Sequence, residues 1–185
     1  MVQIRKATDA DIDALIKSRC RTMREVCSIG ENYEFSAEFM ESTREYFLRG
    51  DGTTVIATDD SAEPPKIVGN ATLCYTNLMP TFSHPGGKRA HLMNVHVEKE
   101  FRRKGIARRM IELLVDEAKE RGVTEISLDA TDDGRKLYEA MGWHKNSEAM
   151  VKDLWKKTIL TVRLKQPVNY ILMDNSVLRK IKFIS

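Results

Sequence analysis

The sequence predicts an α/β fold in which helices flank a mixed, mostly antiparallel β-sheet. Three observations support this prediction: strand-like segments alternate with amphipathic helical segments, two neighbouring strands form a hairpin, and 185 residues suit one domain with a sizeable core. Alternating strands and helices favour an α/β architecture, whereas a hairpin requires antiparallel neighbours, so both strand directions are expected in one sheet.

The N-terminal third should hold one strand and two helices. Val2–Lys6 is expected as a short strand. Thr8 and Asp11 have the spacing of a helix N-cap and its N3 partner, and apolar residues then recur at helical intervals to about Cys27. A second helix is expected over Ser36–Arg49, because apolar and aromatic residues recur there at the same interval.

The middle of the chain favours a hairpin followed by a long connection. Thr53–Thr58 and Lys66–Tyr75 are strand-like and are separated by a turn-rich segment. Asn77–Arg89 contains two prolines and two glycines and is expected to be a long connector.

The later elements alternate between strand and helix. Strands are expected over Ala90–Glu98 and Glu125–Ala130, with an amphipathic helix over Gly105–Arg121 between them. A short helix over Gly134–Met141 and a last strand over Ala149–Leu154 complete the series.

Composition excludes several classes of protein. A hydrophobic share of 42% with 31% charged residues excludes wholesale disorder. No apolar run reaches the roughly 18–20 residues that a membrane span needs, and charges occupy the N-terminal positions where a signal peptide is apolar, so a cytoplasmic location without a membrane partner is expected. Cys20, Cys27 and Cys74 have neither metal-ligand nor disulfide-framework spacing.

The most informative segment is VHVEKEFRRKGIARRMIELL, which begins at Val95. A strand ends, a turn supplies three cations, and Gly105 opens a helix. Helix N-termini present unpaired N–H groups and a positive dipole end, and glycine lets the backbone approach a phosphate closely. This arrangement predicts an anion site. The alternative is a basic loop that only caps an amphipathic helix, and the RxxGxA pattern alone does not decide between the two.

A second segment, LDATDDGRKLYEAMGW, follows about 30 residues later and combines a strand, a polar turn, a Tyr-bearing helix and a Gly–aromatic ending. Together with the opening IRKATDADIDAL, these segments resemble the GNAT acetyltransferase superfamily over residues 2–154. Trp143 stands where the family usually has Phe, a change expected to alter only packing.

The resemblance implies acetyl-CoA as co-substrate and no metal. The cofactor would lie where two strands splay apart, here Leu92–Glu98 and Glu125–Ala130. Strand backbone groups would bind the pantetheine arm and polarise the thioester carbonyl, and N–H groups from about Arg103 to Arg108 would hold the pyrophosphate. The residues implied for the cofactor are Val95, His96, Val97, Arg102, Arg103, Lys104, Gly105, Ile106, Ala107, Arg108 and Thr131.

Tyr138 is implied as the general acid that protonates the departing thiolate, since a phenol pKa near 10 keeps it protonated until a thiolate forms. A half-buried structural tyrosine is the alternative. Many family members carry a carboxylate base on the strand before the phosphate loop, where this chain has Asn94. Asn94 cannot accept a proton but could orient the amine.

His96 lies two residues after Asn94, hence on the same expected strand face, and its ordinary pKa suits a base or proton relay. A hydrogen-bonded structural histidine and a water chain to a more distant carboxylate remain as alternatives.

The family pattern implies that Ser28–Phe35 and Asn77–Arg89 shape the acceptor pocket, with Tyr33, Phe35 and Tyr75 as its lining. The predicted function is transfer of an acetyl group from acetyl-CoA to a primary amine of a small molecule or peptide, by direct attack in a ternary complex. A non-catalytic acyl-CoA-binding sensor or regulatory module is the alternative.

The family-like domain is expected to span residues 1–154, and residues 155–185 form an extension. An added β-segment, a homodimer contact and a non-native extension of the reading frame are all compatible with that tail. Of the formal charge of +3, the tail carries a net +6 and the remainder −3, so the overall basicity does not indicate a nucleic-acid partner.

Overall fold

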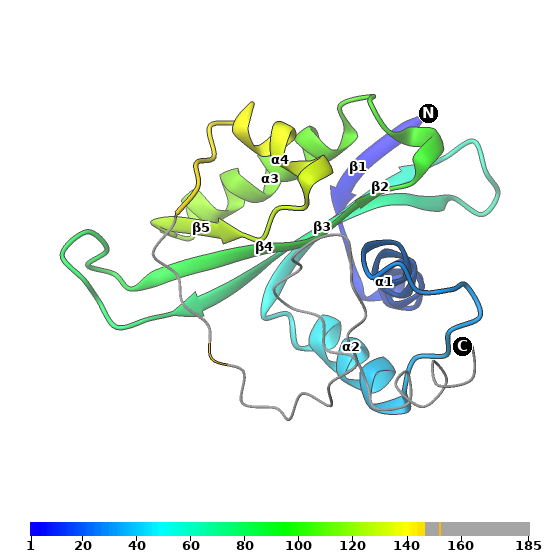
Figure 1. Cartoon of the computed structure of the whole chain (residues 1–185), viewed down its shortest axis with the longest axis horizontal. Coiled ribbons are helices and arrows are strands. Elements are labelled where there is room, and N and C mark those ends of the chain that lie inside the picture. The colour runs from blue at the N-terminus through cyan, green and yellow to red at the C-terminus, as the bar shows by residue number, and fades with distance from the viewer. Residues whose placement is uncertain (147–151, 153–185) are drawn as a thin grey trace, which may run out of the picture. The chain divides into compact units, whose positions relative to one another are not determined.

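The computed structural model describes residues 1–146 and 152. Its centre is a five-stranded sheet in the order β1-β2-β3-β4-β5 (Figure 1). Neighbours from β1 to β4 run antiparallel, whereas β4 and β5 run parallel, so the expected mixed, mostly antiparallel sheet is confirmed. The strands are β1 (Val2–Lys6), β2 (Gly52–Asp59), β3 (Lys66–Asn77), β4 (Lys88–Val97) and β5 (Glu125–Leu128).

Side-chain caps mark the start of the second helix and of the 3₁₀ turn that precedes the first. Ser36 accepts a hydrogen bond from the Phe39 N–H at 3.1 Å, and the Thr8 N–H donates to the Asp11 carboxylate at 2.8 Å. Short 3₁₀ turns over Asp9–Asp11 and Lys99–Phe101 precede two of the helices. The helices are α1 (Ile12–Val26), α2 (Ala37–Arg49), α3 (Ile106–Glu120) and α4 (Asp132–Glu139).

The chain divides into two compact units, residues 1–129 and 130–185. The first contains the sheet with α1, α2 and α3. Of the second, the structure describes α4 and its C-terminal turn up to residue 146, and residue 152. The strand expected over Ala149–Leu154 and the tail over residues 155–185 lie outside the described residues apart from residue 152, so the expected domain boundary stays a prediction.

Strand β3 forms the middle of the core. Its residues Ile67–Leu73 are all buried, which is the pattern of a strand covered on both faces. Helix α3 packs on one face of the sheet and α1 on the other (Figure 1). The apolar stripe of α3 recurs at helical intervals through Ile106, Met110, Ile111, Leu114 and Ala118, all buried.

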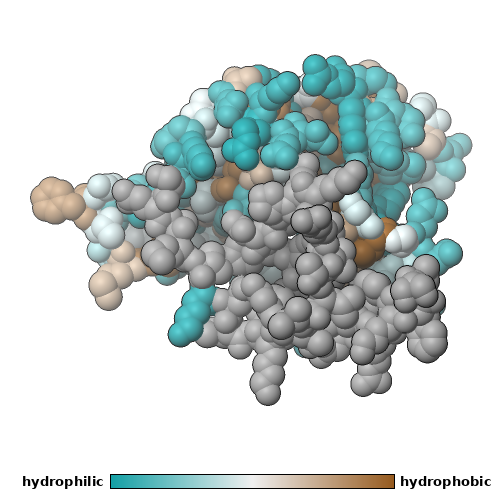
Figure 2. Space-filling view, in the orientation of Figure 1, coloured by the Kyte–Doolittle hydropathy of each residue, from teal (hydrophilic) through white to brown (hydrophobic). Residues whose placement is uncertain are grey.

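The connection between β3 and β4 is shorter than the expected loop over Asn77–Arg89. The two strands remain paired as far as Asn77 and Lys88, so only Leu78–Gly87 forms the turn. Its prolines and glycines mark the tip alone. Apolar side chains gather at this tip (Figure 2), where Leu78, Met79 and Phe82 are exposed. Among the described helices, none is both long and apolar enough to cross a bilayer.

Candidate functional site: the opening between β4 and β5

Strands β4 and β5 separate partway along β4. Their parallel pairing begins at Arg89 and Glu125 and ends at Leu92 and Leu128, yet β4 continues to Val97. Within residues 1–129, the segment 93–97 therefore pairs with β3 on one side and has no β5 partner on the other. This opening is the splay that the family resemblance implies.

A β-bulge lies at the opening. Asn70 pairs with His96 and Thr72 with Met93, so Asn94 and Val95 together oppose the single residue Ala71. Asn94 has a φ of +56°, in the left-handed region that asparagine tolerates better than most residues. The bulge thus changes the direction of β4 just after its pairing with β5 ends.

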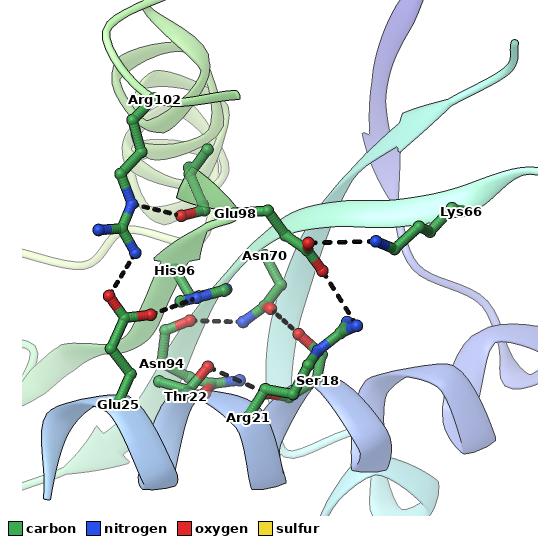
Figure 3. Close-up of polar contacts among 11 residues, drawn as sticks. Ser18, Arg21, Thr22, Glu25, Lys66, Asn70, Asn94, His96, Glu98 and Arg102 are labelled. Atoms are coloured by element: carbon green, nitrogen blue, oxygen red, sulfur yellow. Dashed lines mark hydrogen bonds and ion pairs between the residues drawn. The ribbon is translucent and has the colours of Figure 1, made fainter. Parts of the chain in front are cut away.

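A buried polar bridge holds the bulge against α1 (Figure 3). The fully buried Asn70 side chain donates from Nδ2 to the Asn94 carbonyl oxygen at 2.6 Å. Its Oδ1 accepts from the Ser18 hydroxyl at 2.5 Å. One amide therefore ties a residue of α1 to the irregular backbone of β4, and each of its polar ends is satisfied.

The loop before α3 forms the second part of the site. Gly105 has a φ of +75° and Arg103 a φ of +63°, and α3 begins directly afterwards at Ile106. The first N–H groups of a helix have no intrahelical acceptor. A Cβ at Gly105 would meet no atom within 4 Å, so the space beside this backbone is open. The loop presents the geometry of a phosphate site.

A model of the acetyltransferase (GNAT) family matches residues 14–143, which include the opening, the loop and α4. The chain belongs to the GNAT acetyltransferase family. This membership confirms the resemblance seen in the sequence and supports the expected class of enzyme, an acyltransferase.

Relatives of this GNAT chain include two proteins of different origin. A probable glucosamine 6-phosphate N-acetyltransferase of Oryza sativa subsp. japonica is 30% identical over 108 residues, which are 58% of this chain and 64% of the rice protein. A predicted acetyltransferase of Clostridium acetobutylicum, solved with acetyl-CoA, aligns with a TM-score of 0.71 and 27% identity over 83% of this chain and 97% of its own.

A glucosamine-6-phosphate N-acetyltransferase of Arabidopsis thaliana has the same fold, with a TM-score of 0.62 and 22% identity over 83% of this chain and 99% of its own.

Arg102, the first cation of the GNAT loop, has its side chain engaged within the protein (Figure 3). Its Nε donates to the Val97 carbonyl oxygen at 2.8 Å, and its guanidinium pairs with Glu25 of α1 at 2.5 Å. The next two cations of the loop, Arg103 and Lys104, have exposed side chains. Arg102 therefore orients the loop relative to β4 and α1, and Ile106, which is buried, can offer a ligand only its backbone.

His96 and Glu25 form the next contact of this GNAT site. The His96 Nε2 lies 3.1 Å from a Glu25 carboxylate oxygen. Burial lowers the pKa of His96, and Glu25 only partly opposes this shift. Burial tends to raise the pKa of Glu25, but hydrogen bonds from Arg102 and His96 outweigh it and leave the pKa lowered. The pair is therefore a neutral imidazole held by a carboxylate, while the buried Nδ1 of His96 lacks a partner among the described residues.

Tyr138 and Thr131 lie in the second unit. The Thr131 side chain caps α4 by accepting from the Gly134 N–H at 3.2 Å, which explains why α4 begins at Asp132 and not at the expected Gly134. The Tyr138 ring makes an edge contact with Trp143 at 6.0 Å between centroids. Burial raises the pKa of Tyr138 to about 12, so its phenol stays protonated at neutral pH. The expected roles of both residues stay predictions.

The three expected acceptor residues separate into two places. Tyr33 and Phe35 make an edge contact at 5.0 Å, with the Arg24 guanidinium 4.9 Å from the centre of the Phe35 ring. Tyr75 instead bonds Thr53 at 3.0 Å, and the Arg121 guanidinium lies over its ring at 4.4 Å. The first two residues border α1, whereas Tyr75 contacts the residue that follows α3.

Four residues of the site were not singled out from the sequence: Ser18 and Asn70 of the buried bridge, Glu25, and Arg19, whose guanidinium donates to the Asn94 side-chain oxygen at 3.2 Å. Asn70 did carry a signal, because it interrupts the apolar run of a central strand and a buried amide requires partners. Arg19 also carried a signal, because it stands in the apolar repeat of its helix four residues after Leu15, whereas Glu25 looks like an ordinary charge on the exposed side. Among the described residues, no three His, Cys, Asp or Glu side chains gather as a metal site would require.

Proposed function

We propose that this protein is an N-acetyltransferase that transfers the acetyl group of acetyl-CoA to a primary amine, by direct attack in a ternary complex. The observation that carries the proposal is the end of β4–β5 pairing at Leu92, directly before the bulge and a phosphate-type loop. Family membership and the likeness to the acetyl-CoA-bound clostridial protein support it.

The cofactor would bind mainly to backbone. The unpaired side of β4 offers peptide groups of Val95 and Val97 to the amides of the pantetheine arm, much as a neighbouring strand would. The N–H groups at the start of α3 would donate to the pyrophosphate oxygens, and the exposed Arg103 and Lys104 would add positive charge. A strand N–H near the bulge would stabilise the oxyanion that forms on the thioester carbonyl.

The chemistry requires two proton movements. The neutral amine nitrogen attacks the thioester carbon, the carbon–sulfur bond breaks with its electron pair going to sulfur, and Tyr138 gives its proton to the thiolate. The attacking amine loses one proton to a base. The raised pKa of Tyr138 keeps the acid in its protonated form over the whole working range.

His96 and Asn94 serve the amine side of this proposal. Both contact α1 from β4, since Asn94 accepts from Arg19 and His96 bonds Glu25. The lowered pKa of His96 keeps its imidazole neutral, as a proton relay requires, with Glu25 orienting the ring. Asn94 would orient the amine without taking its proton.

The test is to incubate the protein with acetyl-CoA and a panel of amines while free thiol is monitored and products are weighed by mass spectrometry. The panel includes glucosamine 6-phosphate, because the rice relative is named for it, with amino acids, polyamines, aminoglycosides and peptide N-termini. Thiol release that depends on the amine supports the proposal. Tight acetyl-CoA binding without release for any amine would favour the non-catalytic binding module.

A further inference from the structure

Arg19 occupies an unusual place on α1. It follows the buried Leu15 by one helical turn, so it lies on the side of α1 that faces the sheet. Its guanidinium donates to the Asn94 side-chain oxygen at 3.2 Å. The side chain is only partly exposed, and burial lowers the pKa of the guanidinium because the charged form loses hydration.

No carboxylate of the described residues lies within ion-pair distance of Arg19. The two acids near this end of β4 are held by other cations: Glu25 by Arg102, and Glu98 by Arg21 and Lys66 (Figure 3). The titratable groups around Arg19 are instead the thiols of Cys27, Cys74 and Cys20, and burial raises the pKa of each, so they stay neutral and supply no counter-charge.

This environment leaves most of the hydrogen-bonding capacity of Arg19 free for a ligand. A guanidinium has five N–H donors in a planar fork, and a single amide oxygen at 3.2 Å satisfies at most one of them well. A partly desolvated cation without a counter-charge costs stability, which a bound anion would offset. A carboxylate or phosphate fits the fork with two parallel hydrogen bonds.

The partner of Arg19 fixes where such an anion would lie. Asn94 lies in the bulge, and a strand N–H near this bulge is proposed to bind the thioester carbonyl of the cofactor. An anion at Arg19 would therefore lie within a few bonds of an amine placed to attack the thioester. Asn94 would hold the guanidinium in position from the other side.

We propose that Arg19 is a specificity residue that binds the carboxylate or phosphate of the acceptor, so that the preferred substrate is an amine carrying an anionic group. This inference rests on the proposed acetyltransferase function. It disfavours polyamines and aminoglycosides, since their further positive charges would meet an uncompensated guanidinium.

The first experiment compares amines that differ in one anionic group. β-Alanine is paired with propylamine to test a carboxylate, and O-phosphoethanolamine with ethanolamine to test a phosphate. In the unmodified protein the anionic member of at least one pair should have the higher kcat/KM, and the better pair identifies which anion the site takes.

The decisive variant is Arg19→Met, which keeps an unbranched stem and removes the charged guanidinium. It should lower kcat/KM for the preferred anionic amine by about 30-fold or more and change that for the neutral partner less than about threefold. Arg19→Lys should recover only part of the loss, because an ammonium lacks the planar fork. Arg21→Met, which removes the exposed cation paired with Glu98, is the matched control and should leave the preference intact.

A binding measurement keeps the inference separate from the proposed function. Titration calorimetry of β-alanine and O-phosphoethanolamine is carried out with saturating coenzyme A, so that the phosphate loop is occupied. If the unmodified protein binds one of these amines and Arg19→Met abolishes the binding, the anion site is supported. This holds even if no amine releases thiol, a result that would overturn only the acetyltransferase proposal. Equal binding by both proteins, no binding at all, or an equal kinetic loss for charged and neutral amines would overturn the inference.

Discussion

The side chain of Asn70 donates a hydrogen bond of 2.6 Å to the backbone carbonyl of Asn94, and this contact fixes the β-bulge at the opening between β4 and β5. The two residues belong to neighbouring strands, yet they meet through a side chain, because the bulge displaces the regular ladder. A fully buried amide thus determines the shape of the backbone on which the thioester is proposed to lie.

Asn70→Ala should destabilise the protein by about 2–3 kcal/mol, because the Ser18 hydroxyl and the Asn94 carbonyl would both lose a buried partner. Urea denaturation measures the change. Asn77→Ala, at the exposed end of the same strand, is the control and should change stability by less than about 0.5 kcal/mol. Equal effects of the two substitutions would contradict the structural role of Asn70.

Gly105→Ala should weaken acetyl-CoA binding and lower stability by about 1–2 kcal/mol, since a φ of +75° strains any residue with a Cβ. Gly122 provides a matched control: it follows α3 at the other end with a φ of +73°. Gly122→Ala should lower the melting temperature similarly and leave the Kd for acetyl-CoA unchanged. If both variants lose affinity alike, the effect is one of stability and not of the loop.

Tyr138→Phe should reduce kcat at least about tenfold while the Kd for acetyl-CoA stays nearly constant, because only the proton donor is lost. Steady-state rate assays with the best amine of the panel measure kcat, and calorimetry measures the Kd for acetyl-CoA. Tyr46→Phe removes a phenol that bonds Cys74 and serves as the control. Unchanged turnover of Tyr138→Phe would remove this residue from the mechanism.

The imidazole of His96 should titrate below its ordinary value of 6.5, because burial disfavours the charged form. Its neutral form therefore contributes stability above pH 6.5, and this contribution is lost as the pH falls through the lowered native pKa. NMR titration of the ring protons measures the midpoint. Glu25→Gln should lower it further by removing the opposing carboxylate, whereas Glu41→Gln on the exposed side of α2 should not move it.

Asp11→Asn should cost about 1–2 kcal/mol at pH 7, a figure reduced for solvent screening of the partly exposed Arg5 partner. The bidentate bond from Arg5 lowers the pKa of Asp11 to about 2, so the carboxylate stabilises the fold above pH 4 and ceases to do so as the pH falls through about 2.

Unfolding free energies of Asp11→Asn and the unmodified protein should therefore converge between pH 4 and pH 2. Asparagine keeps an oxygen for the Thr8 cap, so the difference isolates the charge. Asp13→Asn, which alters an exposed ion pair with Arg44, is the control and should show a much smaller difference at pH 7.

Local patterns in the sequence predict much of the fold but few of the side-chain contacts in the site. Helical periodicity and caps such as Ser36 identify α1 to α3, and the Gly105 loop follows from its motif. Thr131 was overlooked as the cap of α4, which moved the expected start by two residues. The contact between Arg102 and Glu25 joins residues 77 positions apart, so no local pattern reveals it.

The bulge at Asn94 was missed for a related reason. Alternation along β4 assumes regular pairing, and the extra residue becomes visible only when β4 is aligned with β3.

The unpaired side of β4 also has a consequence for the association of the protein with other chains. Within residues 1–129, segment 93–97 continues beyond the end of β5, so one side of it is an unpaired strand edge. Its peptide groups can pair there with an extended chain. A peptide that added itself there would occupy the place proposed for the pantetheine arm. Acetyl-CoA would then act as a competitor of strand addition, and its presence should suppress self-association of the protein as well as support catalysis.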